Sequence, residues 1–135
     1  MPDRETLKRA RKDKREGKSP STQASEFVRE EIEHIREGKH GARSTEQAIA
    51  IGLSKARRAG VALKPPSAST TSARARKSAA RDARAGHKKG SHKPSARRAK
   101  ASLSKLKGEP HNVVSRAALS RHSRAVARRK RSARA

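Results

Sequence analysis

Short clusters of Lys and Arg recur along the second half of the chain, and their chemistry suits contact with phosphate. They comprise Arg74, Arg76, Lys77, Lys88, Lys89, Arg97, Arg98, Lys100, Arg128, Arg129, Lys130 and Arg131. Ala, Ser and Pro separate the clusters, and such small spacers let cationic groups approach a phosphate backbone closely. Each such contact releases condensed counterions. The pattern therefore predicts these side chains as phosphate contacts with a polyanion.

The charge is divided unevenly along the sequence. Residues 1–46 contain 12 Lys or Arg and 10 Asp or Glu, whereas residues 47–135 contain 25 and 2, within a net charge of +25. A run of like charge can also be a solvated face or a solubility tail. The density of cations, with only Asp82 and Glu109 among them, favours polyanion binding over that alternative.

Aromatic residues are almost absent, and this bears on the kind of nucleic acid. Phe27 is the one aromatic side chain, and its position suits a core. Binders of single strands stack bases on aromatic rings, so we expect duplex DNA in preference to RNA. An RNA-binding or ribosome-associated protein is the main alternative. A second alternative is an interaction protein whose basic tail only localises it, and attachment to anionic membranes is a weaker third.

The residues offer little to catalysis or to metal binding. There is no Cys, and no two of the six His stand three or four residues apart; they are His34, His40, His87, His92, His111 and His122. No Gly-rich phosphate loop, nucleophile elbow or HExxH motif occurs. We expect no enzyme activity, no cofactor, no metal and no small-molecule substrate. Without an apolar run of ~18–20 residues or a secretory signal, we expect a cytoplasmic protein at the nucleoid.

The elements that would position these cations are helical, so the predicted fold class is all-α. Residues 19–63 predict a small helical hairpin, about 20–63, which could also form a homodimer. Ser19-Pro20 opens its first helix and Gly38 ends it; Ser44–Gln47 is a capping box that opens the second. Gly52 would permit a close approach of the two helices. The predicted core of the pair is Phe27, Val28, Ile32, Ile35, Ile49 and Leu53.

The other segments have weaker patterns. Residues 1–18 predict a mixed-charge leader, either a frayed helix or disordered. Residues 64–111 are interpreted as a low-complexity basic linker, with helix propensity over 74–85 and 95–107. Residues 112–135 predict an Ala/Arg-rich conditional helix capped by Asn112. Because like charges at i,i+4 destabilise an isolated helix, the tail is expected to be largely disordered and to become helical on phosphate neutralisation.

An acidic stripe marks the first helix of the pair: Glu26, Glu30, Glu33 and Glu37, with Glu31 beside it. A solvated face is the simpler interpretation. The alternative is that the stripe docks the cationic tail when no nucleic acid is bound, through a contact that salt would weaken.

Residues 36–60 carry a resemblance. The sequence Arg36-Glu37-Gly38-Lys39-His40-Gly41 followed by QAIAIGLSKARRAG from Gln47 resembles a bacterial family of small, highly basic proteins of unknown function, some labelled DNA-binding. Lys12 to Ile35 is similar to a longer-tailed subgroup. The resemblance supplies no catalytic or ligand residues, and Glu46 stands where many members have a Lys or Arg, which weakens a phosphate role there. In composition alone, the tail is similar to those of histone-like proteins.

Together, these patterns predict a nucleoid-associated, histone-like protein that binds duplex DNA without sequence preference, by neutralising phosphates.

Overall fold

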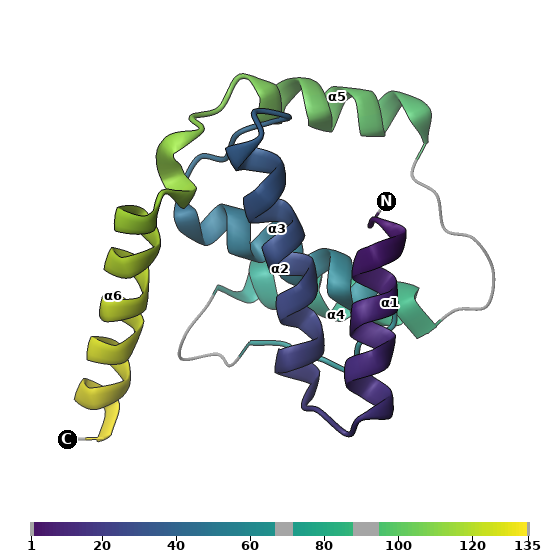
Figure 1. Cartoon of the computed structure of the whole chain (residues 1–135), viewed down its shortest axis with the longest axis vertical. Helices are drawn as coiled ribbons and strands as arrows, with labels where there is room; N and C mark the ends of the chain where they lie inside the picture. Colours follow the sequence, from purple (N-terminus) through teal and green to yellow (C-terminus); the bar gives the residue numbers. More distant parts are fainter. Residues whose placement is uncertain (1, 67–71, 88–94, 135) are drawn as a thin grey trace. The chain divides into compact units, whose positions relative to one another are not determined.

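The computed structural model describes residues 2–66, 72–87 and 95–134, with the side chains of residues 133 and 134 left aside. Regular structure in these ranges is entirely helical, which confirms the all-α prediction (Figure 1). The elements in order are α1 (Arg4–Arg15), α2 (Pro20–Arg36), α3 (Thr45–Arg58), α4 (Ala73–His87), α5 (Ala96–Lys107), the 3-10 turn η1 (Asn112–Val114) and α6 (Arg116–Arg134). Within the described ranges, every helix is too short or too polar to cross a bilayer.

The chain forms two compact units. Unit 1 comprises Met1–Glu31 and Ala50–Lys93, and unit 2 comprises Ile32–Ile49 and Pro94–Ala135. The division falls inside α2 and α3, so each of these helices contributes to both units. Unit 1 contains 21 Lys or Arg and 8 Asp or Glu, and unit 2 contains 16 and 4. The surplus charge, which the sequence concentrates after residue 46, is therefore shared almost equally by the two units.

The helix boundaries of the predicted pair are confirmed. The Thr22 N–H donates to Ser19 Oγ at 3.3 Å, and Pro20 is the first helical residue of α2. At α3, the Gln47 N–H donates to Ser44 Oγ at 3.1 Å. Gly38, after α2, has a φ of 79°, a left-handed conformation that glycine adopts without a steric penalty.

Unit 1 is built around one aromatic ring. Its core comprises Ala10, Ala24, Phe27, Ala56 and Val61, with Leu7, Leu53 and Leu63 packed at the edge. Gly52 allows α3 to lie directly on α2, because a Cβ added there would stand 2.6 Å from Val28 Cα. The predicted close approach at Gly52 is therefore confirmed.

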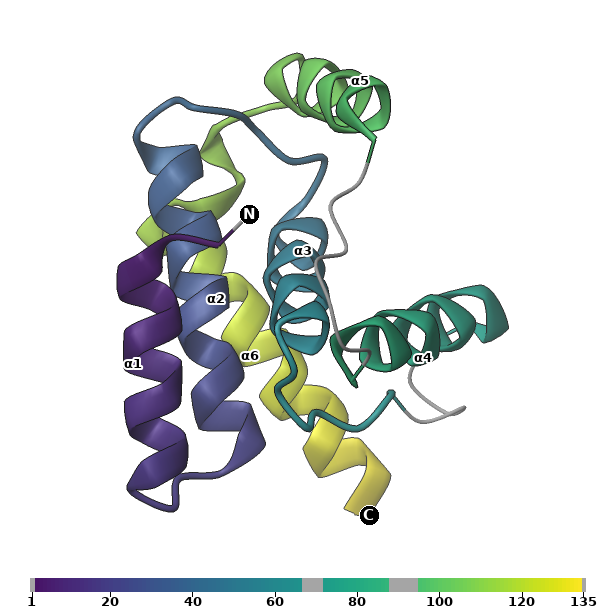
Figure 2. The same cartoon turned by 90° about the vertical axis from the view of Figure 1, so that its right-hand side faces the viewer.

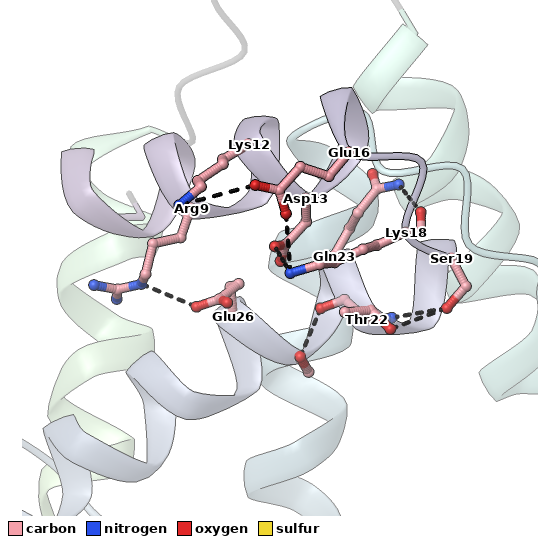
Figure 3. Close-up of polar contacts among 10 residues, drawn as sticks. Arg9, Lys12, Asp13, Glu16, Lys18, Ser19, Thr22, Gln23 and Glu26 are labelled. Carbon is pink, nitrogen blue, oxygen red and sulfur yellow. Dashed lines mark hydrogen bonds and ion pairs between the residues drawn. The ribbon is translucent and has the colours of Figure 1, made fainter.

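The leader is an ordered helix in unit 1 and packs beside α2 (Figures 1 and 2). Its inward face is small and polar, with Thr6, Ala10 and Asp13 buried, which is why apolar periodicity did not reveal it. Figure 3 shows polar contacts of α1, α2 and the turn between them. Arg9 Nε donates to Glu26 Oε2 at 2.9 Å, and Gln23 Nε2 donates to the Lys18 carbonyl at 3.0 Å.

The turn between α1 and α2 is held by charge. Lys18 Nζ lies 3.2 Å from Asp13 Oδ1 and 3.2 Å from Glu16 Oε2. Hydrogen bonds to these two carboxylates raise the pKa of Lys18 above its usual value. Gly17, with a φ of 76°, closes α1. Short-range ion pairs thus add to the packing of Leu7 against the core of unit 1.

Unit 2 has a second, smaller core of Ile35, Ala42, Ala48 and Val114, with Ile32 and Val113 packed against it. The six residues predicted as one core are therefore divided. Phe27, Val28 and Leu53 belong to unit 1, whereas Ile32, Ile35 and the half-buried Ile49 belong to unit 2.

Backbone contacts bring the segment before α6 into unit 2. The Gly41 N–H donates to the Leu106 carbonyl at 2.8 Å, and the Ala42 N–H donates to the Pro110 carbonyl at 2.9 Å. Thr45 Oγ1 donates to the Val113 carbonyl at 2.5 Å. Val113 and Val114 thus act as core residues instead of the first turn of a long helix.

The start of the last helix corrects the sequence prediction. Asn112 begins the turn η1, and the helix proper begins at Arg116. Its cap is Ser115, whose Oγ accepts from the Ala118 N–H at 3.1 Å. The break follows from the burial of Val114, which requires the chain to turn before α6 can start.

Candidate nucleic-acid interface

Ten of the twelve predicted phosphate contacts fall on described helices, whereas Lys88 and Lys89 lie outside the described residues. The ten are distributed over α4, α5 and α6. All are exposed except Arg76, which is half-buried. The structure groups them by helix, three on α4, three on α5 and four on α6.

Helix α5 buries no residue, and its cations are exposed to solvent. It contains Arg97, Arg98, Lys100, Lys105 and Lys107, all exposed, and no acid. Ser95 caps it by accepting from the Arg98 N–H at 3.2 Å. The side chain of Leu103 is 43% exposed. Local helix propensity and a serine cap define this helix, and packing contributes little.

Helix α6 is longer and has two distinct faces. A narrow side is buried or half-buried and consists of Ala118, Leu119, His122, Ala125 and Val126. The exposed cations of α6 are Arg116, Arg121, Arg124 and Arg128 away from that side, and Arg129, Lys130 and Arg131 in the last turns. The helix contains no acid. Arg116, Arg121 and Arg124 were not predicted as contacts, because they stand singly in the sequence and form no cluster.

One acid of unit 2 meets α6. His122 Nδ1 lies 3.3 Å from Glu46 Oε1 at the start of α3. The hydrogen bond that Glu46 accepts from its own backbone N–H, together with the His122 contact, lowers the pKa of Glu46 below its usual value. In unit 2, Glu46 therefore faces an α6 side chain, and its carboxylate makes this position unsuited to phosphate.

Helix α4 differs because it is packed in unit 1 (Figure 2). Asp82 is buried, and its Oδ1 accepts from Arg58 Nε at 2.8 Å while its Oδ2 accepts from Ser54 Oγ. A Cβ added at Gly86 would stand 2.0 Å from the Arg57 carbonyl oxygen. Helix α4 lies in the range interpreted as a linker, so the sequence analysis missed this contact. The available signal was Asp82 itself, the one acid between residues 47 and 108.

The middle of the acidic stripe is not a solvated face, so that interpretation is wrong for Glu30 and Glu31. They are 2% and 1% exposed. Glu30 Oε1 accepts from the Asp3 backbone N–H at 2.7 Å, and Glu31 pairs with Lys55. In unit 1, the partners of these acids and of Glu26 therefore include α1, its N-terminal flank and α3.

Two histidines approach each other in unit 2. The ring centroids of His34 and His40 are 6.1 Å apart in an edge-to-face arrangement. His40 Nδ1 lies 2.9 Å from the Gly41 carbonyl oxygen, to which it can donate. Their spacing of six residues is not a helical ligand spacing, and the turn after α2 brings them together.

Comparison of the chain with protein-family models, with curated proteins and with solved structures found no match. The resemblance to a family of small basic proteins stays a prediction. The features of the chain that bear on function are therefore the charge and exposure of α4, α5 and α6.

Proposed function

We propose that the protein binds duplex DNA without sequence preference by neutralising backbone phosphates, as a nucleoid-associated protein. The observation that carries this proposal is the exposure of the cations of α5 and α6 on two helices that contain no acid. Phosphate contacts account for most non-specific affinity for DNA. Cations without a neighbouring carboxylate on the same helix can make such contacts without first breaking an intrahelical ion pair.

The side chains around these cations also favour backbone binding over base reading. Ala and Ser make up most of the other residues of α5 and α6. Bidentate readout of adenine needs Asn or Gln placed against the base edge, and stacking on bases needs aromatic rings such as those of Phe, Tyr or Trp. Neither helix contains Asn, Gln or an aromatic residue, so duplex DNA is favoured over single strands.

The two helices would be conditional on their ligand. Arg124 and Arg128 stand four residues apart, and Arg97 and Lys100 stand three apart, and like charges at these spacings destabilise a helix. Phosphates remove that repulsion. The tail is therefore proposed to be dynamic in the free protein and to become fully helical on DNA.

The test is a salt titration of binding to a short duplex of mixed sequence, followed by fluorescence anisotropy. If about ten phosphates are neutralised, log K should fall with log[salt] at a slope near −9, since each contributes about −0.9. A scrambled duplex should bind equally well. A slope shallower than about −3 would contradict the proposal.

A charge variant locates the binding helix. Replacing Arg128, Arg129, Lys130 and Arg131 together by Gln removes four exposed cations, and the slope should become shallower by about 3.6. Competition with folded ribosomal RNA at the same salt concentration distinguishes binding of duplex DNA from the main alternative, an RNA-binding or ribosome-associated protein. If RNA displaces the duplex at a much lower concentration, an RNA partner is indicated instead.

A further inference from the structure

One face of α4 is a row of cations that the sequence clusters only partly showed. Arg74, Lys77, Arg81 and Arg84 follow the spacing i, i+3, i+7 and i+10, which places them on one side of a helix. All four are exposed. Together they line a shallow hollow along the helix. We call these four residues the α4 ridge.

The opposite side of α4 is held by contacts in unit 1. Ala79, Asp82 and Gly86 follow the spacing i, i+3 and i+7, and Ala79 and Asp82 are buried. Asp82 accepts from Arg58 and Ser54 of α3, and Gly86 allows the backbones to approach at Arg57. The half-buried Arg76 lies off the ridge.

These two faces combine an anchor and a charged surface on one helix. The carboxylate of Asp82 holds one side of α4 on α3, and the ridge therefore points away from α3. Helix α5 buries no residue, and its contact in unit 2 is at the last turn, where the Leu106 carbonyl accepts from the Gly41 N–H. The α4 ridge would already be helical when a phosphate backbone binds to it, so binding would not include the entropic cost of ordering a helix.

We propose that the α4 ridge is a second, pre-ordered phosphate-binding face, and that Asp82 is the positioning residue that presents it. This inference rests on the proposed binding of duplex DNA. It adds Arg81 and Arg84 to the contacts and assigns a binding role to an acid in the most basic part of the chain.

If Asp82 positions the ridge, its replacement should change the affinity for DNA in the direction opposite to that expected from net charge alone. Asp82→Asn raises the net charge by one, which by itself should strengthen binding to a polyanion. Loss of the anchor should instead free α4 and weaken binding, by about fivefold, which corresponds to about 1 kcal/mol. The matched control is Glu109→Gln, which adds the same charge at the other acid of residues 47–135 and removes no contact of α4.

The experiment measures affinity and salt slope for wild type, both single variants and a ridge variant, on a short mixed-sequence duplex. The ridge variant replaces Arg74, Lys77, Arg81 and Arg84 by Gln. Its slope should be shallower by about 3.6 than that of wild type. Combined with Asp82→Asn, the ridge changes should have a smaller effect, because the ridge is already displaced.

The results separate the inference from the function. Asp82→Asn binding as tightly as Glu109→Gln would overturn the positioning role. An unchanged slope in the ridge variant, whose substitutions are exposed and leave the core intact, would overturn the second face even if Asp82→Asn failed to fold. Both results can occur while the wild-type protein still binds DNA with a steep dependence of log K on log[salt]. If the wild-type protein does not bind DNA, the proposed function itself is wrong.

Discussion

Helices α4 and α5 come from the same stretch of Ala, Ser, Lys and Arg, yet they differ in how they are held. Each begins after a serine cap, and both carry exposed cations. Helix α4 buries Ala79 and Asp82 in unit 1, whereas α5 buries nothing. Composition therefore determines that both are helical, while one carboxylate and one glycine determine which of them packs.

The largest expected effect comes from the core of unit 1, the unit that contains α4. Phe27→Ala removes the fully buried ring of unit 1 and should lower the free energy of unfolding by about 3–5 kcal/mol. Urea denaturation followed by circular dichroism measures it. The matched change in α5 is Leu103→Ala at a half-exposed position, expected within about 0.5 kcal/mol of wild type. Equal losses would contradict the difference between the packed core of unit 1 and the exposed helix α5.

Two glycine substitutions, one at Gly86 in α4 and one at Gly108 after α5, test the packing of α4 directly. A Cβ at Gly86 would stand 2.0 Å from a backbone oxygen, so Gly86→Ala should destabilise unit 1 by about 1–3 kcal/mol. Helix propensity alone would favour the alanine by about 1 kcal/mol, so a loss identifies the close approach. At Gly108, the C-cap of α5, the nearest atom is 3.6 Å away. Gly108→Ala should therefore be nearly neutral in thermal unfolding, and a stabilising Gly86→Ala would rule out the contact.

Substitution of the serine caps of α4 and α5 tests the same difference in packing, with a smaller expected change in unfolding free energy. Ser72 Oγ accepts from the Ala75 N–H, and Ser95 Oγ accepts from the Arg98 N–H, both at 3.2 Å. Ser72→Ala should cost about 0.5–1 kcal/mol of unfolding free energy, because α4 unfolds with unit 1. Ser95→Ala should reduce the helix signal and leave the midpoint of urea unfolding unchanged. A shift of that midpoint in Ser95→Ala would show that α5 is packed after all.

The smallest effect concerns pH and the link between α6 and α3 in unit 2. The pKa of Glu46 is lowered from its ordinary 4.5, so its contribution to stability is complete above that value. The contribution is lost as the pH falls through the lowered pKa. Glu46→Gln should therefore unfold with a weaker dependence on pH in the acid range, as measured by thermal melts between neutral and acid pH. An identical pH profile would contradict the lowered pKa of Glu46.

Local signals in the sequence predicted the helices well, and tertiary partners were predicted poorly. The caps at Ser19 and Ser44 and the stop at Gly38 depend only on neighbouring residues, so they could be identified. The packing of the leader depends on small and charged residues such as Asp13, which have no apolar periodicity. The division of the core into two units could not be inferred, because Val114 joins α2 only through the folded chain.

The predicted interface was identified by charge, and the structure adds its arrangement. Clusters such as Arg128–Arg131 are visible in the sequence as runs of basic residues. The α4 ridge instead combines two cluster residues, Arg74 and Lys77, with Arg81 and Arg84, which stand apart. Helical spacing places these cations on one face, and the anchor at Asp82 turns that face away from α3.

The measurement that tests the central claim most directly is backbone hydrogen exchange of the whole protein, with and without saturating duplex DNA. The account predicts that α4 amides are protected in both states, whereas α5 and α6 amides exchange quickly in the free protein and slowly on DNA. Unchanged exchange in α5 and α6 at saturating duplex would contradict phosphate binding by these helices.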